Sequence, residues 1–570
     1  MATLDRTAVR EAARALGYES LRPGQEEAVT AVLAGHDLLA VMPTGHGKSA
    51  IYQMAALALG GLTVVVTPLI ALQWDQVQHL VDSGADLTAV AINSSRTEHE
   101  NAASWESLAK AATAVVFLAP EQLVKPEVRE RLTARGVTQF VVDEAHCVSA
   151  WGHDFRPDYL RLGEIIDDLG HPVTVAMTAT GSAPVREDIV AKLRLRDAEI
   201  QVSGFERPNL HLEVVRHQHE SEKRQAVLDR VAGLEAPGLV YVATRRDAEE
   251  LAEELSEAGA HRVRAFHGTM PAKQKKAVYD EFHAGEVDVV VATSAFGMGI
   301  DKADIRFVVH ESIPESVDAY YQEIGRAGRD GEPARAVLFY RQEDLGLRSF
   351  FATSSPHPAK LAAIGEQLKK AEAPLEIAEL AEGTGVSARS ATQQLNLLIE
   401  AGAVKEVDGS FALTPEGRDR RVFELVSLAQ EAQEQRDRIE HSRIDMMRLF
   451  AETNECRRRF ILGYFGAQSD HNCGLCDTCE SGAADEYSAA LAGGTSGASE
   501  GDADADADAA GTGATGAEEF AVDEKVEHEQ FGPGTVVSVE DDRITVFFEK
   551  EGYTVLSKEL IAEKHLLTAQ

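Results

Sequence analysis

A glycine-rich segment near the start of the chain has the residue types that bind phosphate groups. It runs from Pro43 to Ser49, after the apolar run Leu38–Val41 and before a helical pattern. Glycines let backbone N–H groups close around phosphates, a lysine reaches the outer phosphate oxygens, and a serine hydroxyl is a ligand for Mg²⁺. The residues expected to bind a nucleoside triphosphate are Met42, Pro43, Thr44, Gly45, His46, Gly47, Lys48 and Ser49. Because Met42 stands where the strict pattern has glycine, this segment alone is only moderately specific.

Two acidic residues follow a second apolar run. Asp143 and Glu144 come directly after Gln139–Val142. The carboxyl ends of parallel strands meet at one edge of a sheet, where open α/β sheets bind ligands. An aspartate there can hold Mg²⁺, and a glutamate can deprotonate the attacking water. We therefore predict that Asp143 and Ser49 are magnesium ligands and that Lys48, Asp143 and Glu144 are catalytic; a solvent-exposed strand end would explain either acid alone.

Two arginines in the second third of the chain have the opposite charge. Arg326 and Arg329 lie three residues apart, which predicts that they share one side of a helical stretch. An arginine that faces the γ-phosphate from a separate lobe typically accelerates phosphoryl transfer by ~10³–10⁵. We predict this catalytic role for both; the alternative is that they form surface ion pairs.

An aromatic-rich segment follows the acidic pair. Trp151, His153, Phe155 and Arg156 fall within six residues, among glycine, aspartate and proline residues that predict a loop. Rings stack on bases, and arginine contacts phosphates. We therefore expect these four residues to bind nucleic acid, the alternative being that Trp151 and Phe155 fill the core.

Four of the five cysteines are grouped near residue 470. Cys456 precedes Cys473, Cys476 and Cys479, a spacing that can place four thiolates around tetrahedral Zn²⁺. A [4Fe–4S] cluster is the alternative, disfavoured because the ferredoxin-type cysteine-proline ending is missing. The fifth cysteine, Cys147, is expected to be a packing residue.

The elements that position these residues form two α/β sets. In residues 1–205, short β-branched runs alternate with helical patterns, and a second set of the same kind covers 206–345. This alternation predicts parallel sheets covered by helices on both faces. We expect two tandem lobes, the first carrying the phosphate loop and the second the arginine pair.

The remainder of the chain predicts four smaller units. Three helical patterns and a hairpin around Asp408-Gly409 indicate a winged helix over 356–418, and a helical pair leads into the cysteines over 419–480. Residues 481–520 are acidic and rich in Gly, Ser and Ala, which predicts a disordered linker. Three strand patterns within 521–570 predict a small β-barrel.

Bulk properties restrict the class of protein. The net charge is −37 and the first 340 residues are acidic too, which by itself argues against a nucleic-acid partner, although a local groove can still bind one. Adaptation to high internal salt and drift in a high-GC genome both remain possible causes. The clustered cysteines favour a reducing compartment. The uncharged stretch Ser49–Trp74 includes Gln53 and Pro68, so we expect a cytoplasmic, nucleoid-associated protein without a membrane span.

These motifs resemble the RecQ family of DNA helicases over about 16–345 and 420–480. Tyr18, Arg22 and Gln25 match that family's adenine-reading motif, which implies that they bind the base of ATP. Segments Thr67–Leu72, Ala119–Leu123 and Met177–Thr180 resemble its strand-gripping and coupling motifs, and Val291–Lys302, with Thr293, is similar to its second-lobe motif. The resemblance implies an ATP-dependent, 3′→5′ DNA helicase of recombination and repair, with ATP, Mg²⁺ and Zn²⁺ as cofactors and single-stranded DNA, or duplex with a single-stranded end, as partner.

Three features depart from the family pattern. His46 replaces the usual glycine, and the winged helix precedes the cysteine module instead of following it. Its third helix has a single basic residue, Arg389, so the family's DNA-splitting wing is not carried over. The C-terminal module resembles the tudor-like module of UvrD/PcrA-type helicases, which implies a protein partner. The alternatives are an RNA-directed DEAH-type ATPase and a non-catalytic nucleic-acid-binding scaffold.

Overall fold

The computed structural model describes most of the chain. The described residues are 2–43, 45–68, 70–149, 151, 156–202, 204–259, 261–296, 302–352, 357–407, 409–467, 469, 471–494, 520–540 and 542–570. Three residues predicted to bind ligands, Thr44, His153 and Phe155, lie outside this set. Within it, every helix is too short or too polar to cross a lipid bilayer.

Lobe 1 is built on a seven-stranded parallel sheet in the order β3-β4-β2-β5-β6-β1-β7. The strands are β1 Leu38–Val41, β2 Gly61–Val66, β3 Thr88–Ile92, β4 Thr113–Leu118, β5 Val137–Val142, β6 Val173–Thr178 and β7 Glu199–Val202. All but β3 and β7 were predicted from their β-branched runs. Those two strands lie at the sheet edges, where partly exposed residues weaken the apolar signal.

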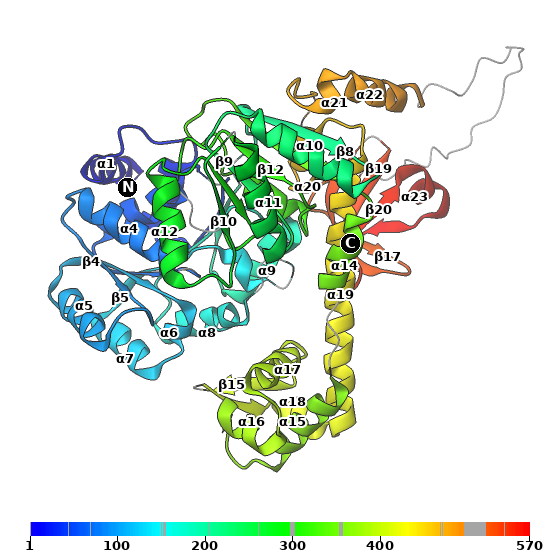
Figure 1. Cartoon of the computed structure of the whole chain (residues 1–570). Helices are drawn as coiled ribbons and strands as arrows, with labels where there is room; N and C mark the ends of the chain where they lie inside the picture. The colour runs from blue at the N-terminus through cyan, green and yellow to red at the C-terminus, as the bar shows by residue number, and fades with distance from the viewer. Residues whose placement is uncertain are drawn as a thin grey trace, which may run out of the picture.

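Helices cover both faces of this sheet, as the left-hand lobe in Figure 1 shows. They are α1 Ala2–Ala15, α2 Gln25–Leu33, α3 Lys48–Leu59, α4 Ile70–Asp82, α5 Glu98–Lys110, α6 Pro120–Leu123, α7 Pro126–Arg135, α8 Leu162–Asp168 and α9 Ala183–Lys192. Two short 3₁₀ helices, η1 Ala145–Val148 and η2 Pro157–Arg161, follow the acidic pair. Separate apolar cores form on the two faces, because the side chains of buried parallel strands point alternately to either side.

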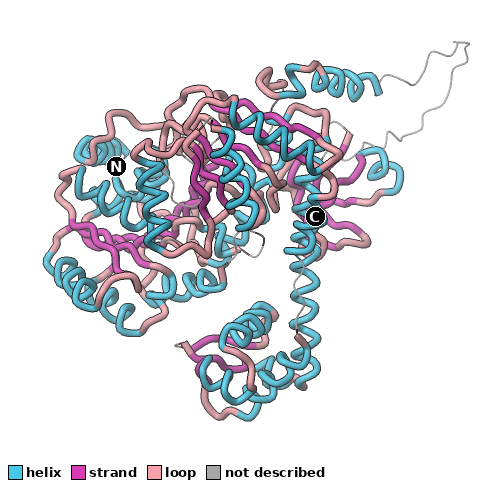
Figure 2. The backbone as a smooth tube through the Cα atoms, in the orientation of Figure 1, coloured by secondary structure: helices cyan, strands magenta, loops and turns pink. Residues whose placement is uncertain are grey.

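Lobe 2 has a six-stranded parallel sheet in the order β10-β11-β9-β12-β13-β8. The strands are β8 Leu210–Arg216, β9 Gly238–Tyr241, β10 Val263–Phe266, β11 Val289–Ala292, β12 Phe307–His310 and β13 Ala334–Tyr340. The helices are α10 Glu220–Ala232, α11 Arg245–Ala258, α12 Ala272–His283, α13 Val317–Ile324 and α14 Asp344–Ala352. The two parallel-sheet lobes expected from the sequence are therefore confirmed, and Figure 2 shows the sheets as two separate groups of strands.

The winged-helix segment sits at one end of a long helical arm. It contains α15 Pro358–Lys370, β14 Leu375–Glu376, α16 Ile377–Thr384, α17 Ala388–Glu400, β15 Val404–Val407, β16 Ser410–Leu413 and α18 Pro415–Asp419. Ser387 caps α17 as expected, since its side chain accepts a hydrogen bond from Ser390 N. The arm is α19, Val422–Glu452, which carries this segment away from lobe 2 (Figure 1).

The other end of the arm leads into the cysteine module. Its helices are α20 Arg457–Tyr464, α21 Asp477–Glu480 and α22 Ala483–Gly494. The expectation that the disordered linker begins at 481 is wrong, because α22 occupies the first part of that range. Alanines favour the helix despite the small and acidic residues around it.

The chain ends in a compact antiparallel sheet, here called the C-terminal module (520–570). Its elements are β17 Lys525–His528, β18 Gly532–Val539, β19 Arg543–Phe548, β20 Gly552–Ser557, α23 Lys558–Lys564 and β21 Leu567–Ala569. The strand order β20-β19-β18-β17-β21 leaves β20 and β21 at the edges, so the described strands form a sheet without the closed ring of a barrel. The module lies against the upper part of α19 (Figure 1).

Candidate ATP, DNA and zinc sites

Three adjacent strands of lobe 1 bring the phosphate-binding residues together. β5, β6 and β1 are neighbours in the sheet, and their carboxyl ends lead to Asp143, to the segment after Thr178 and to the glycine-rich loop. The loop is joined to β6 because Met42 N donates to Thr178 O at 3.0 Å. The predicted phosphate loop and acidic pair therefore share one edge of the sheet, as their sequence positions required.

The glycine-rich loop ends in a helix start. Gly45 and Gly47 have φ values of 83° and 74°, which L side chains rarely adopt, and Gly47 precedes the first residue of α3, Lys48. A Cβ on Gly47 would also lie 2.7 Å from Gln25 Nε2. Lys48 Nζ donates to Met42 O at 3.0 Å, so the ammonium group lies over the loop where phosphates would bind. Ser49 is the second residue of α3, in place for a Mg²⁺ ligand.

The residues of the predicted adenine site surround this loop. Gln25 Nε2 donates to His46 O at 3.2 Å and Gly47 O at 3.0 Å, and its Oε1 accepts from Arg22 N at 2.9 Å. Arg22 also donates to Gly45 O. Tyr18 OH donates to Gln53 Oε1 at 2.6 Å. In this state Gln25 holds the loop backbone, a role that its motif did not predict, and reading of adenine stays a prediction for these three residues.

Electrostatics at the acidic pair fit a site for a cation. Burial, reinforced by Glu144, raises the pKa of Asp143 to about 7, while Lys48 opposes this rise. Burial also lowers the pKa of Lys48, opposed by the two carboxylates. A buried carboxylate beside a serine hydroxyl and an acidic neighbour is a donor set that suits Mg²⁺, which would favour the ionised form of Asp143. His46 remains neutral, because burial and the charges of Arg22, Arg207 and Lys48 lower its pKa to about 4.

Glu144 is held in an unusual backbone conformation. Its φ of 49° and ψ of 48° lie in the left-handed region, which costs energy for a residue with a side chain. Glu144 Oε2 lies 3.4 Å from His146 Nδ1, and His146 Nδ1 lies 3.0 Å from Thr178 Oγ1. The Thr178 hydroxyl donates to Thr180 O at 2.7 Å, so His146 is the donor to Thr178. A chain of polar contacts thus runs from the candidate base to the segment after β6.

Lobe 2 places one of the two arginines over the glycine-rich loop. A Cβ on Gly45 would lie 3.1 Å from Arg329 Cγ, and the positive charge of Arg329 acts on Lys48. Arg326 is 3% exposed and its charge acts on Tyr241 within lobe 2. The expected helical stretch is wrong, because α13 ends at Ile324 and both arginines lie on the turns that follow.

A buried arginine that sequence patterns did not reveal supports these turns. Arg207 donates to Gly325 O at 3.0 Å and to Ala327 O at 2.5 Å. Asn209 Nδ2 adds a bond to Gly328 O at 2.8 Å. These side chains precede β8 and lie more than a hundred residues before the turn that they hold, so no local spacing could have linked the two segments.

The aromatic loop is only partly described, and its tryptophan has an unexpected neighbour. The half-buried Trp151 ring packs edge-on against Phe547 of the C-terminal module, with ring centroids 5.4 Å apart. Arg156 donates to Pro68 O at 3.4 Å, within the predicted strand-gripping motif Thr67–Leu72. Thr293 is half-buried just after β11 in lobe 2. Binding of DNA by these residues stays a prediction, and in this state Trp151 contacts the chain itself.

The four clustered cysteines form a site of the size that zinc requires. The sulfurs of Cys456, Cys473, Cys476 and Cys479 all lie within 4.8 Å of one another, and Cys473 and Cys479 are 3.9 Å apart. Zn–S bonds of ~2.3 Å in a tetrahedron separate sulfurs by about 3.8 Å, so the donor set fits Zn²⁺. Cys147 lies in the apolar core instead, as expected.

The cysteine loop also closes the edge of the lobe 2 sheet. Asp477 Oδ2 accepts from Val214 N of β8 at 3.1 Å, and Leu212 of the same strand forms a β-bridge with Cys476. Arg457 pairs with Asp477 at 3.0 Å. The metal site therefore fixes α20 and α21 to lobe 2.

Three protein-family models match the chain in the order of its structural units. The DEAD/DEAH box helicase model matches residues 22–189, and the helicase conserved C-terminal domain matches 211–331. The third model, RecQ zinc-binding, matches 418–480, which contains all four cysteines. The chain belongs to the RecQ family of helicases. Zinc is therefore the metal of its cysteine cluster.

Similar proteins carry the same family names. The chain is 39% identical over 332 residues to the probable ATP-dependent DNA helicase RecS of Bacillus subtilis, covering 58% of this chain and 66% of that one. It is 39% identical to the ATP-dependent DNA helicases RecQ of Pasteurella multocida and Bacillus subtilis, covering 64% and 60% of this chain and 58% of each relative. The chain thus spans two thirds or less of these relatives' length. A solved structure of Mycobacterium smegmatis helicase Lhr is 20% identical with a TM-score of 0.46, covering 76% of this chain and 61% of that one.

Proposed function

We propose that the chain is an ATP-dependent DNA helicase. The observation that carries this proposal is the facing of two lobes across one glycine-rich loop. Lys48, Asp143 and Glu144 come from lobe 1, and Arg329 from lobe 2 lies over Gly45 of that loop. Phosphoryl transfer needs both lobes, because the residues of lobe 1 hold the nucleotide and its metal while the arginine of lobe 2 neutralises charge on the transferred phosphate. The names of the family relatives support DNA as the polymer.

Each residue has a stated task in this proposal. Lys48 and the loop N–H groups bind the phosphates, and Ser49 and Asp143 hold Mg²⁺, which offsets negative charge when bound. Glu144 orients the attacking water and takes its proton. Arg329 stabilises the charge that develops on the γ-phosphate. His146 contacts both Glu144 and Thr178, so a change in the position of Glu144 during hydrolysis shifts Thr178 and the segment after β6. Movement of that segment then shifts the residues that bind the polynucleotide.

The finer properties belong to the same proposal and rest on the family resemblance. Translocation is 3′→5′ along one strand, the substrate is a duplex with a single-stranded end, and the protein acts in the cytoplasm at the nucleoid. The residues proposed to contact DNA are Trp151, His153, Phe155, Arg156 and Thr293. Tyr18, Arg22 and Gln25 are proposed to bind adenine once nucleotide replaces the present contacts.

A strand-displacement assay tests the proposal. We expect ATP-dependent separation of a DNA duplex with a 3′ tail and at least ~10-fold slower separation of the matching RNA duplex. Lys48→Ala should abolish both ATP hydrolysis and strand separation, while Lys110→Ala, an exposed lysine of α5, should leave them unchanged. Preferential opening of RNA would replace the proposal with an RNA-directed ATPase. ATP hydrolysis that is indifferent to any nucleic acid would end it.

A further inference from the structure

The C-terminal module docks on the lobe 1 segment that follows β6. Tyr553 OH lies 2.8 Å from Ser182 Oγ, immediately before α9. Arg186 Nη2 donates to both carboxylate oxygens of Asp523 at 2.9 Å, and Lys525 pairs with Glu187. Three side chains of the module therefore hold one end of a single lobe 1 helix.

The same module also contacts the aromatic loop. Phe547 packs against the Trp151 ring, as described above, and Trp151 O accepts a hydrogen bond from Arg443 of α19. Arg443 is 1% exposed and pairs with Glu440 at 2.8 Å. Trp151 is consequently held between the module and the arm helix.

On its other side the module is fixed to the arm helix. Tyr553 N donates to Ser442 Oγ at 3.0 Å, and a Cβ on Gly552 would lie 2.1 Å from that same oxygen, so the backbones approach closely. Arg438 Nε donates to Lys550 O and Gln435 Nε2 to Glu549 O, each at 2.7 Å.

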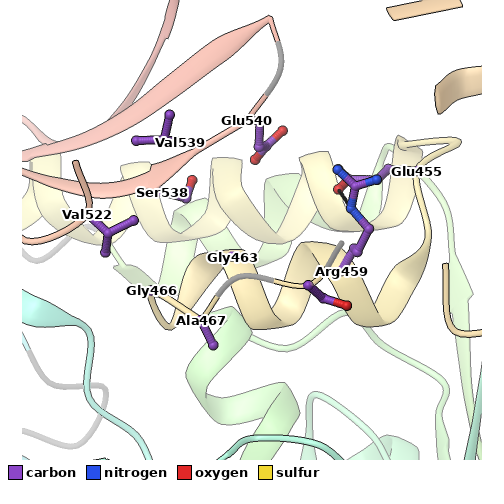
Figure 3. Close-up of a pocket in the computed structure, with 10 residues that line it drawn as sticks. Glu455, Arg459, Gly463, Gly466, Ala467, Val522, Ser538, Val539 and Glu540 are labelled. Atoms are coloured by element: carbon purple, nitrogen blue, oxygen red, sulfur yellow. Dashed lines mark ion pairs between the residues drawn. The ribbon is translucent and has the colours of Figure 1, made fainter. Parts of the chain in front are cut away.

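The module also reaches the start of the zinc-binding segment. Arg543 pairs with Glu455 at 3.0 Å, and the Tyr553 and Tyr464 rings lie 5.2 Å apart. A pocket of about 340 Å³ lies where α20 meets β18, and Figure 3 draws residues that line it, such as Gly463, Val522 and Ser538. The two elements are in contact beside this pocket, so the module also packs on α20.

The two sides of the module differ in how easily they separate. Lys525 and Glu187 are 47% and 50% exposed, and Asp523 is 53% exposed, whereas its partner Arg186 is 10% exposed and the bond between Tyr553 and Ser182 is buried. Exposed ion pairs are weak and are screened by salt. The module packs more extensively on α19 than on α9, and its contacts with α19 include the bond from Tyr553 N to Ser442 Oγ. The contacts with lobe 1 are therefore the smaller of the module's two attachments.

These releasable contacts lie next to the chain of polar contacts from Glu144. Ser182 follows Thr178 by four residues, and Arg186 Nη1 donates to Gly181 O at 3.0 Å. Thr178 in turn bonds His146, which faces Glu144. The module thus touches both segments that leave the catalytic edge of lobe 1, one after β5 and one after β6.

We propose that the C-terminal module is an intramolecular brake on the motor, a claim that rests on the proposed ATPase function. Docked on Ser182, Arg186 and Trp151, it fixes lobe 1 to the arm helix and so opposes the lobe movement that turnover requires. Nucleic acid that engages the aromatic loop detaches the module from lobe 1 and releases the brake. The partner of this surface on lobe 1 is therefore a segment of the same chain, not a separate protein.

A triple variant of the full chain, Asp523→Asn with Lys525→Gln and Tyr553→Phe, tests the brake. It removes the two charges of the module that pair with α9 and the hydroxyl that contacts Ser182, and it keeps Phe547 and the anchor on α19. We expect ATP hydrolysis without DNA to rise about fivefold or more, the lower range of coupling between protein sites. Hydrolysis at saturating DNA should change less than about twofold, because DNA has already released the module. The net charge of the triple variant is that of the parent, and Glu529→Gln, an exposed residue of the same module, is the control for removing a charged surface group.

Docking is measured separately, by amide hydrogen exchange of Ala183–Lys192 in the Lys48→Ala background. This readout needs no ATP hydrolysis, so it still reports on docking if the proposed function fails. Faster exchange in the triple variant, together with faster DNA-free hydrolysis, supports the brake. Unchanged exchange would show that these contacts do not hold the module. Faster exchange with unchanged or slower hydrolysis would show that docking does not restrain the motor, and either result overturns the proposal.

Discussion

The nucleotide site and the docking surface of the C-terminal module are built in opposite ways from the same lobe. The nucleotide site uses short consecutive segments, with backbone groups of Gly45 and Gly47 and side chains that follow β1 and β5 directly. The docking surface joins Ser182 to Tyr553, which are 371 residues apart. The lobe 1 part of the first depends on geometry that is local to the strand ends. The second joins distant segments through one buried hydrogen bond and two ion pairs, so separating lobe 1 from the module breaks few contacts.

The largest effect that tests this comparison is expected from removing Arg329, the residue that lobe 2 places at the nucleotide site. Arg329→Ala should lower DNA-stimulated ATP hydrolysis by ~10³-fold, since the guanidinium that neutralises the transferred phosphate is lost. Nucleotide binding by lobe 1 should change little. Arg335→Ala, an exposed arginine on β13, is the control. A loss of less than about tenfold would assign Arg329 a structural role over Gly45 and leave catalysis to other groups.

Loss of zinc should destabilise the segment that the C-terminal module contacts and leave the nucleotide site intact. Cys476→Ser should remove bound zinc and lower the temperature of unfolding, because the metal holds α20 and α21 against β8. Binding of a fluorescent ATP analogue should stay within about twofold of the parent value. Cys147→Ser, outside the cluster, should keep its zinc as measured by elemental analysis. A variant that loses zinc and nucleotide binding together would contradict the separation of the two sides.

The polar contacts that connect the nucleotide site with the docking surface depend on one hydroxyl group, that of Thr178. Thr178→Val removes the hydroxyl that joins His146 to Thr180 O. We expect stimulation of ATP hydrolysis by DNA to fall about tenfold, since a buried polar group left without its hydrogen-bond partner costs about 1–3 kcal/mol. Thr174→Val is a close match, because Thr174 is buried on the same strand and its hydroxyl bonds only Pro172 O among the described contacts. Equal stimulation in both variants would show that the signal takes another path.

The smallest effect concerns the winged-helix segment, which contacts lobe 1 through the ion pair of Arg161 and Glu406 at 2.8 Å. Arg161→Ala should change the free energy of unfolding by less than about 1 kcal/mol, as for other partly exposed pairs. ATP hydrolysis without DNA should not change. An increase matching that of the C-terminal triple variant would mean that the winged helix restrains the motor too, and the contrast would then extend to both appended modules.

Sequence patterns located most of the fold because the buried parallel strands read as apolar runs. In the two lobes, the strands that escaped them are β3, β7 and β8, which lie at sheet edges and have partly exposed residues. The helix predicted around the two arginines was wrong, since Arg207 and Asn209 hold those residues in turns after α13. The five strands of the C-terminal module form one antiparallel sheet, and α22 occupies the start of the range expected to be a linker. Tertiary contacts override local propensity at the arginine turns, whereas α22 forms where alanines favour a helix.

The sequence by itself indicated the phosphate loop, the acidic pair and the cysteine cluster, because the residue types and spacing of each restrict the chemistry that it can perform. The tertiary structure alone decided that Arg329 lies over Gly45, that Gln25 holds the loop, and that Trp151 faces Phe547. Those contacts join segments tens to hundreds of residues apart. The packing of lobes and modules decides which residues meet, and hydrophobic periodicity along the chain carries no information about that packing.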